Sequence, residues 1–156
     1  MIAVDTGLLV CAHRADLDLH EAGRAALERL SRHPDGWAIP WPCAHEFLAV
    51  VSGPTFGRAS TPVEVAFDTL RAWLSHPRCV AIGEAPRHLG LLEGLCTRAA
   101  LSGGSLHHAR IAAICLAHEV EELWTSDRDF ARFPDLRVRN PLIPSLHEPA
   151  ARARPR

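Results

Sequence analysis

The sequence predicts an α/β fold, a sandwich in which helices cover a mostly parallel sheet. Short apolar runs of strand length alternate along the chain with longer segments whose apolar residues recur at helical spacing. Strands separated in this way by helices become parallel neighbours through right-handed crossovers. In open sheets of this kind, ligands bind beyond the carboxyl ends of the strands, so catalytic or ligand-binding residues are expected there.

Five short segments are predicted to be strands, the last of them at an edge of the sheet. They span residues 2–4, 37–39, 79–82, 122–125 and 136–138. The first strand ends at Asp5, and the second is stopped by Pro40. The fourth strand leads directly into Asp127 and Asp129. Two of the predicted strands are therefore followed within two residues by an acidic residue.

Helices are predicted in the intervals between these strands. The clearest signal is Thr61-Pro62-Val63-Glu64, which reads as a capping box with proline at the first helical position, and its helix runs to about Ser75. Another helix begins near Pro42 and ends at Gly53 and Pro54. The remaining predicted helices span about residues 8–12, 18–31, 86–101 and 106–119.

Composition indicates a single globular domain. The chain has 156 residues, of which 47% are hydrophobic and 22% charged. It has no apolar run of roughly 18 residues and no basic region before its first apolar residues, so we expect a cytoplasmic protein. The five cysteines form no C-x-x-C pair and are expected to be reduced thiols in the core. The polar stretch 144–156 is predicted to be a disordered tail.

Carboxylates from three segments are expected to meet at one edge of the sheet. Asp5 and Asp127 follow strands, Asp129 lies two residues further on, and Glu46 is early in a helix that begins just after a strand. Each acid alone could be a helix cap, a surface residue or part of a turn. Together they offer the hard oxygen ligands that suit Mg²⁺ or Mn²⁺. Cations held in this way can activate water for in-line attack on a phosphodiester.

Four motifs in order along the chain carry a resemblance to a known family. They are IAVDT at residues 2–6, PWPCAHEF at 40–47, TSDRDF at 125–130 followed by RFP at 132–134, and NPL at 140–142. In this order they resemble the PIN-domain family, specifically the VapC-type toxins of bacterial type II toxin–antitoxin pairs. The capping-box stretch and PRHL at residues 86–89 also resemble stretches of that family.

The resemblance implies a PIN-like three-layer α/β/α sandwich over residues 1–143 with a central, mostly parallel sheet. It implies an endoribonuclease dependent on Mg²⁺ or Mn²⁺, neutralised by a cognate antitoxin and assembled as a homodimer. Asp5, Glu46 and Asp127 carry over as the catalytic, metal-holding residues. Asp129 carries over as a supplementary ligand or as support for the ligands. Thr6 either orients Asp5, contacts a bound water, or only caps its helix.

One position departs from the family pattern. The family has an acid at the start of its penultimate helix, and here that place is taken by His108. An imidazole is a softer ligand that removes one negative charge. Three outcomes follow: weaker activity with Mg²⁺, a preference for a transition metal, or a crippled site. We interpret the neighbouring His107 as a surface or packing residue.

The sequence leaves alternative functions open. A degenerate PIN domain would bind antitoxin or RNA without cutting, and a phosphatase or DNA nuclease could use the same acids. The net charge of −1 argues against a broad nucleic-acid coat but allows a local basic rim. The candidates for RNA contacts are the arginines nearest the acids: Arg14, Arg110, Arg128 and Arg132.

Overall fold

A computed structural model describes residues 1–54 and 59–143. The predicted tail, residues 144–156, lies outside the described residues. The helices and strands follow in the order β1 (Ile2–Val4), α1 (Thr6–His13), α2 (His20–Ser31), β2 (Trp37–Pro40), α3 (Trp41–Ser52), α4 (Val63–Leu74), β3 (Cys79–Ile82), α5 (His88–Arg98), α6 (Leu106–Ala117), β4 (Glu122–Trp124) and β5 (Val138–Arg139), with 3₁₀ turns at η1 (Gly103–Ser105) and η2 (Arg128–Arg132).

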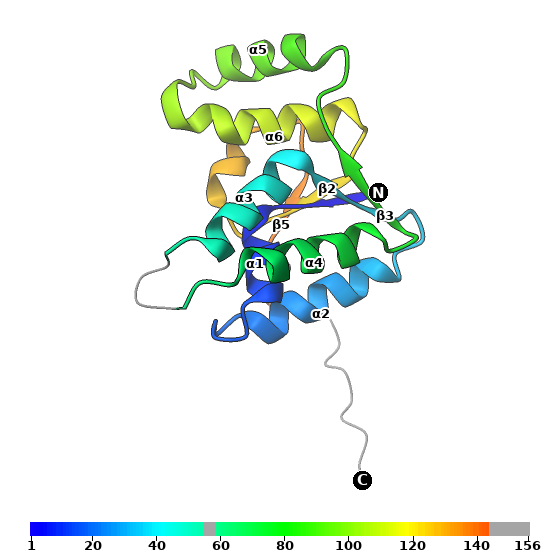
Figure 1. The fold of residues 1–156 in the computed structure, drawn as a ribbon. Helices are drawn as coiled ribbons and strands as arrows, with labels where there is room; N and C mark the ends of the chain where they lie inside the picture. Colours follow the sequence, from blue (N-terminus) through cyan, green and yellow to red (C-terminus); the bar gives the residue numbers. More distant parts are fainter. Residues whose placement is uncertain (55–58, 144–156) are drawn as a thin grey trace.

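The five strands form one parallel sheet in the order β3-β2-β1-β4-β5 (Figure 1). The central strand β1 pairs with both β2 and β4, so that Ala3 lies opposite Ala38 on one side and Leu123 on the other. All the pairings are parallel, which confirms the predicted α/β class. The carboxyl ends of β1 and β4 therefore lie next to each other at the same edge.

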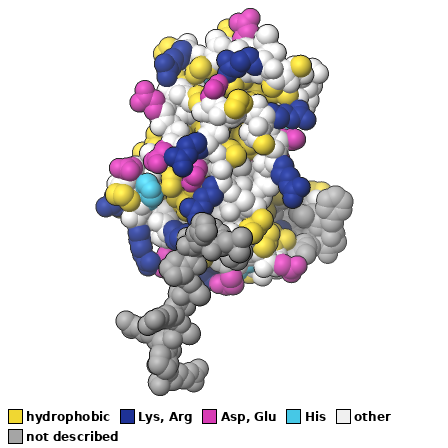
Figure 2. All heavy atoms as spheres, turned by 180° about the vertical axis from the view of Figure 1, so that it is seen from behind, with side chains coloured by type: hydrophobic (Ala, Val, Ile, Leu, Met, Phe, Trp, Pro, Cys, Tyr) yellow, Lys and Arg dark blue, Asp and Glu magenta, His cyan; other side chains and the backbone are white. Residues whose placement is uncertain are grey.

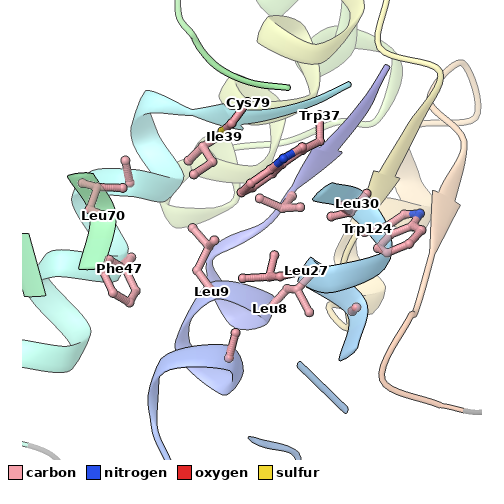
Figure 3. Packing of buried hydrophobic residues seen from close by; sticks show 14 of the residues in the cluster. Leu8, Leu9, Leu27, Leu30, Trp37, Ile39, Phe47, Leu70, Cys79 and Trp124 are labelled. Atoms are coloured by element: carbon pink, nitrogen blue, oxygen red, sulfur yellow. The ribbon is translucent and has the colours of Figure 1, made fainter. Parts of the chain in front are cut away.

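Helices cover both faces of the sheet, which confirms the three-layer arrangement. Successive strand residues point to opposite faces, so Ile2 and Val4 pack with residues of α1, α2, α3 and α4, whereas Ala3 packs with residues of α5 and α6. Figure 1 shows α5 and α6 on one side of the sheet and α2 and α4 on the other. Ile2 and Val4 belong to one cluster of buried residues, and in Figure 3 Leu8 of α1 lies beside Leu27 of α2 in this cluster, whereas Leu9 points toward Ile39.

The predicted capping box before α4 is wrong. The helix begins at Val63 behind the N-cap residue Pro62, and no side chain caps it. The hydroxyl of Thr61 instead lies 3.1 Å from Nε2 of His13, at the end of α1. This contact joins residues 48 positions apart, so the local sequence gives no sign of it. Pro40, predicted to stop the second strand, forms its last residue, and α5 is shorter at both ends than predicted.

The surface of the described residues mixes charges of both signs. Figure 2 shows arginine side chains spread over one face of the molecule and interspersed with acidic ones. None of the helices in the described part of the chain is long and apolar enough to span a membrane. All five cysteines are free thiols, as expected.

Candidate active site

Three elements deliver carboxylates to one cavity at the carboxyl edge of the sheet. Asp5 follows β1, Asp127 follows β4, and Glu46 lies in the second turn of α3, which begins where β2 ends. The cavity has a volume of about 740 Å³. Its polar walls are formed by Asp5, Thr6, Glu46, His107, His108, Ser126 and Asp127. Residues far apart in the sequence are thus gathered because their strands are neighbours.

Asp5 is the most buried of the three acids, with only 7% of its surface exposed. Its Oδ2 accepts a hydrogen bond from the Thr125 hydroxyl at 2.7 Å, and the Cys43 thiol lies 3.7 Å from Oδ1. Burial raises the pKa of Asp5 above its ordinary value, and the nearby Glu46 and Asp127 raise it further. Hydrogen bonds from the Thr125 hydroxyl and from the Thr6 backbone lower the pKa of Asp5 but do not cancel this rise. The site therefore holds an acid that gains from a cation beside it.

Glu46 is held by its neighbours from two other helices. The Thr6 hydroxyl donates to Oε2 of Glu46 at 2.5 Å, and Nε2 of His107 lies 3.3 Å from the same oxygen. Thr6 makes no side-chain cap for α1, since the N-cap residue Asp5 precedes it without such a bond. Of the roles considered for Thr6, the structure shows neither capping nor a side-chain bond to Asp5. It shows orientation of Glu46.

Asp127 is fixed through both carboxylate oxygens. Oδ1 accepts the backbone N–H of Asp129 at 2.8 Å, and Oδ2 lies 2.8 Å from Nε2 of His108. The pKa of Asp127 is lowered, first by the Asp129 backbone bond and then by His108. The backbone N–H of Asp127 donates to the Thr125 hydroxyl at 2.9 Å. Thr125 thus links Asp127 to Asp5 through one hydroxyl group.

The four arginines chosen as candidates for RNA contacts lie in different environments. Arg14 is buried and binds Asp16 through two nitrogens, each at 2.8 Å. Arg110 binds Glu84, with its Nε at 2.7 Å from the carboxylate. Arg128 is exposed and lines a depression together with Asp127, while Nε of the exposed Arg132 lies 3.8 Å from Asp129. The cavity wall itself includes none of the four.

Three residues that sequence reasoning passed over contact the acids. Thr125 and Cys43 touch Asp5, and His107, treated above as a surface or packing residue, forms part of the cavity wall beside Glu46. The position of Thr125 at the end of a predicted strand, two residues before Asp127, was a usable signal. Nothing local marked Cys43, whose thiol is completely buried.

The donor set fits a divalent cation. Two of the carboxylates, Glu46 and Asp127, have side chains that are each 42% exposed, so they face the cavity and can be reached from solvent. Asp5 is buried, and its pKa is raised although the Thr125 hydroxyl and the Thr6 backbone both donate to it. Carboxylate oxygens gathered in this way are the ligands that Mg²⁺ and Mn²⁺ take in proteins. His108 adds one imidazole nitrogen to the same site.

Comparison with known proteins links this site to a family, although no family model matches the chain. Ribonuclease VapC31 of Mycobacterium tuberculosis is 33% identical over 143 residues, covering 91% of this chain and all of the relative. Ribonuclease VapC43 of the same species is 32% identical over 147 residues, covering 94% and 99%.

Solved structures share the fold. A VapBC2 complex of Rickettsia felis, bound to a promoter DNA fragment, superposes with a TM-score of 0.67 at 23% identity, covering 90% of this chain and 98% of the other. VapC20 of M. tuberculosis, a toxin that cleaves the sarcin–ricin loop, gives a TM-score of 0.63 at 14% identity, covering 84% and 93%. Sequence relatives and fold agree: the chain belongs to the VapC family of PIN-domain ribonucleases.

Proposed function

We propose that this chain is the endoribonuclease toxin of a VapBC-type toxin–antitoxin pair and hydrolyses RNA phosphodiester bonds with Mg²⁺ or Mn²⁺. The observation that carries the proposal is the meeting of Asp5, Glu46 and Asp127 in one cavity. The sequence relatives named as ribonucleases support the reaction class. We also expect the family's homodimer and a cytoplasmic location.

The side chains divide the work of holding the cation. Asp5, Glu46 and Asp127 would be its ligands, with Asp129 and His108 beside them. When bound, the cation supplies neutralisation of the phosphate and activation of a water molecule. Thr6 keeps Glu46 turned into the cavity, and Thr125 does the same for Asp5. Arg128, which lines a depression together with Asp127, would contact a phosphate of the bound RNA.

The test is cleavage of a mixed panel of structured and single-stranded RNAs by the purified protein. Cleavage should require added Mg²⁺ or Mn²⁺, stop in EDTA, and be lost in Asp5→Asn. The matched control is Asp68→Asn, which removes an exposed carboxylate on α4 that pairs with Arg71. Cleavage that persists in EDTA, or at full rate in Asp5→Asn, contradicts the proposal.

The second candidate function is a degenerate PIN domain that binds antitoxin or RNA with little cleavage. The contact between His108 and Asp127 favours it, because this histidine stands where the family has an acid and holds one oxygen of Asp127. A wild-type protein that is inert on every RNA, while His108→Asp cleaves with Mg²⁺, would establish this alternative.

The partner proposed is a small antitoxin that covers the cavity. An unfilled group of carboxylates attracts a guanidinium for the same reason that it attracts a metal, so we expect an antitoxin arginine between Asp5, Glu46 and Asp127. The VapBC2 complex of R. felis supports such a partner. An inhibited complex in which the cavity remains open to solvent would show that blocking is not the mechanism.

A further inference from the structure

A group of three side chains lies at the outer side of the cavity, where α6 meets the segment after β4. It consists of His108, Asp127 and Asp129, and each can offer one ligand atom such that these atoms lie within 4.8 Å of one another. In residues 1–54 and 59–143, this is the one group of three or more histidine, cysteine, aspartate or glutamate side chains that meets so closely. We propose that this group is a binding site selective for a borderline transition cation of the Zn²⁺ class over Mg²⁺.

The packing of His108 determines which of its two ring nitrogens faces the cavity. Its Nδ1 is buried without a hydrogen-bond partner among the described residues, and its ring meets that of Phe130 edge to face at 5.1 Å. Nε2 is therefore the nitrogen turned toward the cavity, 2.8 Å from Oδ2 of Asp127. The side chain of His108 is 22% exposed, so an ion can reach Nε2 from solvent.

The side chain of Asp127 is fixed by hydrogen bonds, whereas that of Asp129 is more exposed. Asp127 has one oxygen engaged by the backbone of Asp129, which leaves Oδ2 facing His108. The side chain of Asp129 is 52% exposed, and Nε of Arg132 lies 3.8 Å from its Oδ1. Asp129 can therefore close toward the other two ligands. With ligands about 2.0–2.2 Å from a tetrahedral Zn²⁺ and therefore about 3.5 Å from one another, Asp129 would move closer while His108 Nε2 and Asp127 Oδ2 would move slightly apart from 2.8 Å.

The ligand types decide which ion is preferred. One imidazole and two carboxylates with an open fourth position form a donor set that Zn²⁺ uses in proteins, whereas Mg²⁺ demands six oxygens in an octahedron. Affinity of nitrogen-containing sites rises along the first transition row toward Cu²⁺ and Zn²⁺. Because His108 stands where the family has an acid, the group of His108, Asp127 and Asp129 should prefer borderline cations to hard ones. The more deeply buried Asp5 remains next to an oxygen of Thr125.

The alternative explanation is a plain hydrogen bond between His108 and Asp127 with no ion involved. Both explanations agree with the 2.8 Å contact, and ion binding separates them. The inference deepens the proposed function and rests on it for its meaning in catalysis. Binding itself is measured without RNA, so the two can fail separately.

The experiment is titration of the full-length protein with Zn²⁺ and with Mg²⁺ by calorimetry, and with Co²⁺ by visible absorption. We expect one Zn²⁺ bound at least about 100-fold more tightly than Mg²⁺, and weakening by about 10-fold or more in His108→Ala and in Asp129→Asn. His108→Asp should lose the Zn²⁺ preference. The control His45→Ala removes an exposed imidazole that stacks on Trp41 outside the cavity and should change nothing.

Three results would overturn the inference. They are equal Zn²⁺ affinity in the wild type and His108→Ala, no preference for Zn²⁺ over Mg²⁺, and a thiolate charge-transfer band with Co²⁺ that assigns binding to cysteine. RNA cleavage scored in parallel distinguishes the two proposals. Cleavage that needs Mg²⁺ and Asp5, with Zn²⁺ affinity independent of His108, refutes only the inference. Zn²⁺ binding through His108 in a protein that cuts no RNA refutes only the nuclease.

Discussion

Replacing Asp5 by asparagine should abolish RNA cleavage and at the same time stabilise the metal-free protein. The carboxylate is 7% exposed and receives a hydroxyl bond from Thr125, a backbone bond from Thr6 and a weak thiol contact, where it has capacity for about four. A buried polar group left unsatisfied costs about 1–3 kcal/mol. Because the amide keeps the shape but not the charge, we expect a gain of about 1 kcal/mol, or roughly 2–4 °C in melting temperature for a domain of this size.

Added metal should make the wild type more stable than Asp5→Asn, the reverse of their order without metal. A cation at 100 times its dissociation constant stabilises the folded state by about 2.7 kcal/mol, which exceeds the gain from removing the charge. Asp5→Asn should lose most of this stabilisation. The assay is thermal unfolding of both proteins in EDTA and in saturating Mn²⁺. A variant that melts below the wild type in EDTA, or equal stabilisation of both by Mn²⁺, would refute the reasoning.

The difference in stability between the wild type and Asp5→Asn should change with pH in a definite direction. Burial raises the pKa of Asp5 in the folded protein, so between the ordinary value of 3.8 and the raised value the folded state holds a proton that the unfolded chain has lost. This group therefore lowers stability as pH rises through that window. Asp127 has a lowered pKa and acts in the opposite direction, but it is present in both proteins. The stability advantage of Asp5→Asn in EDTA should grow with pH and then level off.

Two further substitutions test positioning and packing. Thr6→Val removes the hydroxyl that holds Glu46, so it should weaken Mn²⁺ binding by about 10-fold with little change in the free energy of unfolding. Thr6→Ser keeps a hydroxyl and should bind Mn²⁺ like the wild type. Equal Mn²⁺ affinity of Thr6→Val and the wild type would contradict this role of Thr6. Gly23→Ala would bring a Cβ to 2.7 Å from the backbone nitrogen of Ala12, so it should lower the free energy of unfolding in urea by about 1–3 kcal/mol. Gly90→Ala on α5 has open space around it and should raise the same free energy by about 0.5–1 kcal/mol. Similar effects of the two substitutions would show that α1 and α2 are not packed this closely.

Four of the five strands could be predicted closely from the sequence because each is a short apolar run with a clear end. The last strand was predicted at residues 136–138 but forms at Val138–Arg139, because Leu136 closes a turn with Phe133 and packs into the core. Asp5 follows the first run, and the structure ends β1 at Val4. The meeting of Asp5 and Asp127 at one edge followed from the rule that parallel strands end together. The chain did not reveal that β1 would lie between β2 and β4, which is what places these acids next to each other.

Contacts between segments that are distant in the sequence could not be predicted from it. Thr61 looked like a helix cap, but its hydroxyl is taken by His13 from another helix. Thr6 looked like a cap or a partner of Asp5, and it holds Glu46, which is 40 residues away. In each case a short polar side chain had several possible partners, and the tertiary packing chose one. Local propensity carries no information about that choice.

The central place of β1 also determines when during synthesis the cavity can exist. Strand β1 leaves the ribosome long before its partner on one side, β4, which is made only at residues 122–124. The bond between Thr125 and Asp5 spans 120 residues, and Asp127 comes still later. Because chains emerge N-terminus first, the whole segment from Asp5 to Asp127 must be translated before three carboxylates surround the cavity. A fragment released early, by a premature stop or a protease, would carry Asp5 and Glu46 but no complete site.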